Sequence, residues 1–68
     1  MLTDTEEKVF DLIVHNEAGM DTADIVRRSD VDPLEVPKAI GGLLKAGMVR
    51  VIFYLYAHGD KIPNFGVA

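Results

Sequence analysis

The ionisable side chains of this chain are seven Lys and Arg, eleven Asp and Glu, and two His. There is no cysteine, and the two histidines, His15 and His58, lie far apart in the sequence. No glycine-rich phosphate loop and no nucleophile–base pair at a recognisable spacing is present. We therefore expect no enzyme activity, no metal, no cofactor and no small-molecule substrate. The question that remains is binding, and for it the basic residues of the second half of the chain are the candidates.

Basic residues and glycines share one face of a helix expected between Asp32 and Gly47. At 100° per residue, the face opposite Val36 and Ile40 carries Leu34, Lys38, Gly41, Gly42 and Lys45. Lysines there are placed to neutralise phosphates, and Lys38 also to reach guanine acceptors. The two glycines leave a shallow notch that permits close backbone approach. This face is predicted to contact nucleic acid.

Three further residues are predicted to extend this surface: Arg50 at the start of a strand, Lys61 at a hairpin tip and Asn64 on the return strand. Asn64 is expected to touch a groove edge. Two exposed lysines are also ordinary for a solvated helix, and the helix face has no Arg, Asn, Gln or Ser to read a base. These residues are compatible with both sequence-specific and nonspecific binding of nucleic acid.

Charge is divided unevenly along the chain, whose formal net charge is −4. Residues 1–32 hold three basic and nine acidic residues, a charge of −6, whereas residues 33–68 hold four basic and two acidic residues, a charge of +2. Overall acidity disfavours nucleic acid, but the asymmetry indicates a directed electrostatic face. A chance difference in so few charges is the alternative.

The length of 68 residues predicts one small domain, residues 1–68, with one modest core. The absence of cysteine excludes a disulfide scaffold. No apolar run approaches the roughly 20 residues that span a bilayer, and the N-terminus is acidic. We expect no membrane association and a cytoplasmic location, or a nuclear one in a eukaryote.

Helix signals dominate the first part of the chain. Thr3 and Glu6 form a capping-box pattern, and apolar spacing carries a helix to about Asn16. Met20, a lone apolar residue between turn and cap, is compatible with a very short strand. Asp21 or Thr22 then caps a second helix of about two turns, with Arg27 and Arg28 near its end.

A third helix and a hairpin are expected to follow. Asp32 is predicted to cap the helix, with Glu35 completing a capping box, while Pro37 favours a kink or a later start. The predicted buried stripe is Val36, Ala39, Ile40, Leu43 and Leu44. Residues 48–57 have strand composition, residues 58–61 form the turn, and residues 63–67 return as a shorter strand, with Pro63 at an edge.

The order of elements and several motifs resemble the winged helix-turn-helix superfamily. The resemblance lies in residues 22–26, in the Val36, Ile40 and Leu43 spacing, and in the segment 44–49, which is similar to the exit from a recognition helix into a wing. It implies an α+β fold of three helices with a C-terminal two-stranded β-hairpin wing. The superfamily includes DNA readers, RNA readers and protein-docking modules.

Residues 35–43 followed by residues 62–65 are also similar in spacing to the Zα family, which binds Z-DNA. That family places an Asn and a Tyr on the third helix and a Trp in the wing. Here Pro37, Gly41 and Phe65 stand at those positions, and only Pro63 and a basic residue, Lys38, match. Z-form binding is therefore the most distant of the functions considered.

The strand from Val51 to Ala57 is unusually apolar for a two-stranded wing. Alternation predicts Val51, Phe53 and Leu55 on one face and Ile52, Tyr54 and Tyr56 on the other. Phe10, Val14 and the C-terminal residues cover the second face in one interpretation. In the other, Ile52, Tyr54 and Tyr56 bind a protein partner or a second copy.

These observations favour a winged-helix protein that binds double-stranded DNA, as a transcriptional regulator or accessory factor. The third helix would enter the major groove and the hairpin would act as the wing. The alternative is a protein-interaction module that docks through the strand 51–57 or through the acidic N-terminal half.

Overall fold

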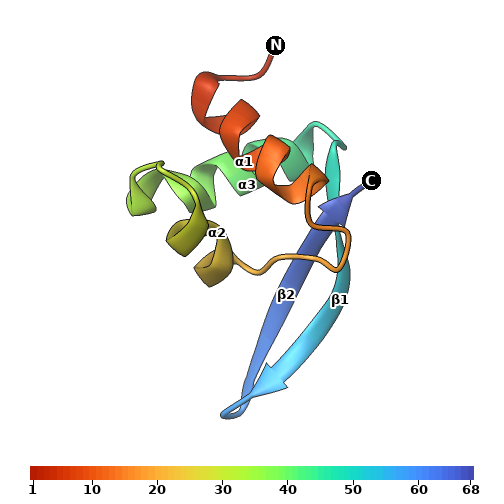
Figure 1. Cartoon of the computed structure of the whole chain (residues 1–68). Coiled ribbons are helices and arrows are strands. Elements are labelled where there is room, and N and C mark those ends of the chain that lie inside the picture. The colour runs from red at the N-terminus through yellow and green to blue at the C-terminus, as the bar shows by residue number, and fades with distance from the viewer.

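The computed structural model describes all residues, 1–68. Three helices precede a two-stranded antiparallel hairpin, which confirms the predicted α+β class (Figure 1). The elements in chain order are helix α1 (Asp4–Val14), helix α2 (Thr22–Arg28), the 3₁₀ turn η1 (Pro33–Glu35), helix α3 (Val36–Lys45), strand β1 (Val49–Ala57) and strand β2 (Asp60–Val67).

Helix α1 begins with the predicted capping box. The Thr3 side chain accepts a hydrogen bond from the Glu6 amide at 3.1 Å, and Glu6 Oε1 accepts one from the Thr3 amide at 2.9 Å. These bonds satisfy two donors that a helix start leaves unpaired. The helix ends at Val14, two residues before the expected Asn16.

Helix α3 starts later than the Asp32 signal predicted. Asp32 caps only the 3₁₀ turn η1, by accepting a hydrogen bond from the Leu34 amide, and Glu35 makes no capping bond. The α-helix begins at Val36, so Pro37 lies in its first turn, where a missing amide N–H is tolerated. The later helix start that Pro37 predicted is therefore confirmed. The prediction of a capping box at Asp32 is wrong.

The hairpin turn is tighter than predicted. It consists of His58 and Gly59 alone, both with positive φ (52° and 82°), and Asp60 already pairs with Ala57. Two-residue turns with positive φ match the twist of the flanking strands. The return strand therefore begins at Asp60 rather than at Pro63.

A bulge at Ile52 changes which side chains of β1 share a face. Val51 pairs with Phe65 and Phe53 pairs with the adjacent Asn64, so Ile52 has no partner. Because neighbouring residues of β2 face opposite ways, Phe53 lies on the face opposite Val51. The predicted grouping of Val51, Phe53 and Leu55 is therefore wrong.

Because of the bulge, Ile52 does not share a face with Tyr54 and Tyr56, although the alternation of the sequence predicted that it would. Its Cδ1 atom and Cε1 of Phe53 would lie 2.9 and 3.1 Å from a Cβ built on Gly19, so the two side chains reach the same point. Tyr54 and Tyr56 instead share the face of Val51. The bulge thus divides the predicted partner-binding set between two faces.

One apolar core joins the helices to the base of the hairpin. Its buried residues are Val9, Ile13, Met20, Ile25, Val36, Ala39, Ile40, Leu43, Val49 and Phe65. Met20 and Phe65 also exchange two backbone hydrogen bonds of 2.8 and 3.1 Å, so the very short strand at Met20 is confirmed as a single bridge.

Leu44 departs from the predicted buried stripe, since 39% of its surface is exposed. None of the helices combines the length and the apolar content that a bilayer crossing requires. The outer half of the hairpin projects away from the helices, as Figure 1 shows.

Candidate nucleic-acid interface

The exposed side of α3 carries both predicted lysines. Lys38 and Lys45 are exposed, as are Pro37, Gly41 and Leu44, whereas Val36, Ala39, Ile40 and Leu43 are buried on the other side. Lys45 follows Lys38 by seven positions, a rise of about 10 Å along the helix axis. Gly41 is open, because a Cβ built there would contact nothing within 4 Å.

The two lysines differ in their partners. Lys38 Nζ lies 3.8 Å from Glu35 Oε1, one turn earlier, and both side chains are largely exposed. Such a surface pair contributes little and is readily exchanged for another anion. Lys45 has no carboxylate within ion-pair distance. Leu34, in η1 at the start of the same face, is 80% exposed.

Gly42 does not form the open notch that the sequence predicted. It is only partly exposed, and a Cβ built on it would overlap Oε2 of Glu6 on α1. Lys38 lines a surface hollow with Thr3 and Glu6, and Lys45 lines a second hollow with Glu6 and Gly42. The Glu6 carboxylate therefore lies between the two lysines.

Arg50 does not extend the lysine surface of α3. It lines a hollow with Val14, the last residue of α1, with Asn16 and Glu17 from the following loop, and with residues of the hairpin, and no α3 residue contributes. Arg50 is therefore not among the residues that line the hollows of Lys38 and Lys45. The pairing of Arg50 with Gly66 directs its side chain away from the core face of the hairpin.

Lys61 and Asn64 occupy contrasting positions on β2. Lys61 is exposed near the hairpin tip, with Nζ 4.2 Å from the centroid of the Tyr54 ring. Asn64 is only 4% exposed, and its Nδ2 donates to the Ile62 carbonyl at 3.4 Å. The prediction that Asn64 touches a groove edge is wrong, because the α1–α2 loop around Gly19 covers it.

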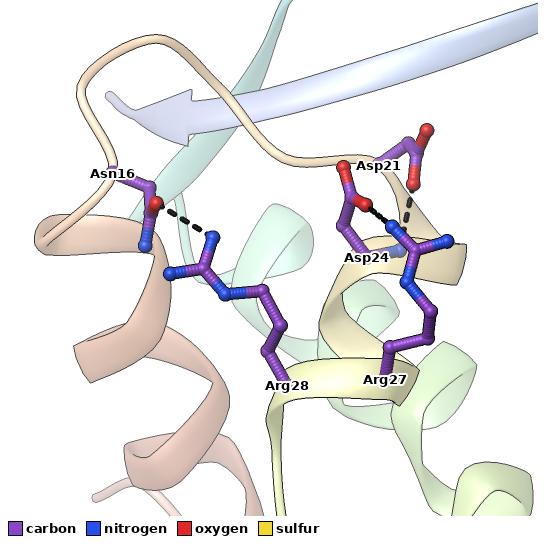
Figure 2. A network of polar contacts seen from close by, with 5 residues as sticks. All are labelled: Asn16, Asp21, Asp24, Arg27 and Arg28. Atoms are coloured by element: carbon purple, nitrogen blue, oxygen red, sulfur yellow. Dashed lines mark hydrogen bonds and ion pairs between the residues drawn. The ribbon is translucent and has the colours of Figure 1, made fainter.

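The arginines of α2 have structural partners in this fold (Figure 2). Arg28 Nη1 donates to Asn16 Oδ1 at 3.0 Å, and Asn16 in turn donates to the Leu12 carbonyl at 2.8 Å. Arg27 pairs with Asp24, whose amide is capped by Asp21. The Arg28 contact links α2 to the residues that follow α1, whereas the Arg27 pair and the Asp21 cap lie within α2 itself.

The two exposed tyrosines lie on the outer half of β1. Tyr54 and Tyr56 belong to a run, residues 53–57, in which every residue is exposed. Phe10, Val14 and the C-terminal residues therefore do not cover this part of the strand. Phe65 stands where the Zα family has the Trp of its wing. It is buried in the core, so its ring is not presented at the surface.

No group of three or more His, Asp or Glu side chains is arranged to hold a metal ion. The position of Glu6 over α3 is the feature of this surface that the sequence did not reveal. Its capping pattern predicted only a local role, and no local signal reports which distant helix a side chain meets.

Comparison with protein-family models, curated proteins and solved structures finds no match to this chain. The fold itself defines the class: a small α+β domain of three helices and a C-terminal antiparallel hairpin. This layout is compatible with a winged helix.

Proposed function

We propose that this chain is a winged-helix protein that binds duplex DNA, with α3 in the major groove and the hairpin as the wing, and that it acts as a transcriptional regulator or accessory factor. The observation that carries the proposal is the exposed pair Lys38 and Lys45 on one side of α3. Beyond Glu35 at its start, that side carries no carboxylate of its own.

The chemistry of this surface suits phosphates better than base edges. Lysine is a compact point charge on a flexible stem, and it pairs with phosphate oxygens without fixing a base identity. Gly41 leaves room for the DNA backbone at the middle of the face. We therefore propose binding that is mainly electrostatic and weakly selective for sequence.

The hairpin supports a second contact. Lys61 is exposed near its tip, beyond the helices, and its ammonium group rests against the Tyr54 ring without a carboxylate partner. A projecting strand pair with a cation near its tip has the form of a wing that reaches the backbone beside the groove. Arg50 and Asn64 are left out of this interface.

A salt titration of duplex binding tests the proposal. Lys38→Ala and Lys45→Ala are each expected to weaken binding to all duplexes alike, and to lower the slope of log K against log salt by about 1. Lys8→Ala is the matched control, because Lys8 lies on α1 and pairs with Asp30 at 3.5 Å. Absence of duplex binding at low salt, or an equal loss in Lys8→Ala, contradicts the proposal.

A protein-interaction module is the second candidate, and one observation favours it. The outer half of β1 exposes Phe53, Tyr54, Leu55 and Tyr56, a mainly apolar cluster that a small soluble domain rarely leaves open.

A further inference from the structure

Strand β1 has an open hydrogen-bonding edge along its whole length. The sheet has only two strands, and β1 pairs on one side with β2. The outer edge of β2, by contrast, is closed at Phe65 by the bridge to Met20. An edge strand presents unpaired amide and carbonyl groups, which make it a template for a further strand.

The outer part of this edge lacks the devices that normally block strand addition. Residues 53–57 contain no proline, glycine or charged residue, and the bulge lies before them at Ile52. They are exposed on both faces and regularly paired with β2. A regular, uncharged and exposed edge of this kind accepts a partner strand readily.

We propose that residues 53–57 of β1 pair antiparallel with the same residues of a second copy of this chain. A two-fold axis at Leu55 would set Tyr54 opposite Tyr56 of the second copy, and Phe53 opposite its Ala57. Residues opposite each other share a face, so four tyrosines would gather on one face. The result is a four-stranded sheet in the order β2-β1-β1-β2.

The charge distribution argues for a second copy at this surface. Each chain carries −4, and the acids lie in the helical half, so two copies repel most strongly through their helices. The hairpin holds only Arg50, Asp60 and Lys61, a charge of +1, and residues 53–57 have none. The outer hairpin is therefore where two acidic copies approach with little repulsion.

The available area indicates a weak dimer. Phe53, Tyr54, Leu55 and Tyr56 are 40, 45, 52 and 75% exposed. With 150–250 Å² for a whole aromatic side chain, these fractions amount to about 400 Å² per copy. Two copies would bury at most about 800 Å², below the ~1,200 Å² of stable interfaces. We therefore expect a dimer that forms only at high concentration.

Sedimentation measurements from ~10 µM to ~1 mM test the dimer. The wild-type chain is expected to shift from monomer to dimer across this range. Leu55→Lys places two like charges at the axis and is expected to raise the dissociation constant at least ~10-fold. Val14→Lys, which adds the same charge at another partly exposed apolar residue, is expected to leave the dissociation constant unchanged.

Amide exchange of the wild-type chain provides a second measurement that needs no variant. Protection of alternate amides within residues 53–57 is expected to rise with protein concentration, whereas amides of α1 stay unchanged. A monomer throughout the range overturns the proposal, as does a dimer that Leu55→Lys leaves intact. Either result leaves the proposed contacts of Lys38 and Lys45 with DNA untouched, because neither lysine belongs to residues 53–57.

Discussion

Two adjacent glycines of α3 illustrate how much a single position depends on its surroundings. Gly41 faces open space, while Gly42 lies under the Glu6 carboxylate of α1. A glycine within a helix costs about 1 kcal/mol relative to alanine through its backbone freedom. At Gly41 nothing offsets that cost, whereas at Gly42 the missing side chain leaves room for Glu6 to complete its capping box.

Gly41→Ala is therefore expected to raise the free energy of unfolding by about 0.5–1 kcal/mol. Gly42→Ala is expected to give little or no gain, since its Cβ displaces Glu6 from the Thr3 amide and the lost capping contact is worth about 1 kcal/mol. Urea unfolding of both variants measures the difference. Equal stabilisation would show that Glu6 does not depend on Gly42.

The hairpin shows how one element combines a predictable period with an unpredictable irregularity. The composition of β1 predicts a strand, but the bulge at Ile52 decides which side chains share a face. Gly66 is part of that irregularity: a Cβ there would lie 2.9 Å from Cγ2 of Ile52. The missing side chain at Gly66 accommodates the extra residue on the opposite strand.

Gly66→Ala is expected to lower the free energy of unfolding by about 1–3 kcal/mol, because the added methyl group overfills this site. Ile52→Ala removes the atoms it would meet, so the double variant is expected to be more stable than the sum of the two single effects predicts. Chemical denaturation of the three variants gives the coupling. Simple additivity would show that the two side chains do not meet.

At the scale of the whole molecule, the fold brings together acidic and basic residues that are separate along the sequence. The acidic half and the basic half are separate along the chain, but α1 packs on α3 and brings Glu6 between Lys38 and Lys45. Arg50 instead lines a hollow with Val14, at the end of α1, and with Glu17, which follows it. The positive field at α3 is therefore weaker than the +2 charge of residues 33–68 indicates.

Glu6→Gln is expected to strengthen binding of duplex DNA several-fold at low salt, because it removes the charge of a carboxylate that lines one hollow with Lys38 and another with Lys45. The amide oxygen keeps the capping bond to Thr3, so the fold is retained. Glu7→Gln is the matched control: it makes the same charge change in the same turn, but Glu7 lines a hollow that contains no α3 residue. Equal gains in both variants would attribute the effect to net charge alone.

The sequence by itself determined the features that depend on neighbouring residues. The Thr3 and Glu6 capping box, the buried stripe of α3 apart from Leu44 and the change of period at β1 follow from bonds and spacings within a few positions. For the second helix the sequence narrowed the cap to Asp21 or Thr22, and the structure shows that it is Asp21. The exposed positions of Lys38, Gly41 and Lys45 follow from the same helical period.

Only the tertiary structure decided which distant groups meet. Burial of Asn64, the cover of Gly42 by Glu6, the separation of Arg50 from α3 and the transfer of Ile52 to the other face of β1 all arise from packing between elements. No local pattern encodes them, because a helical or strand period specifies a face but not what lies against it.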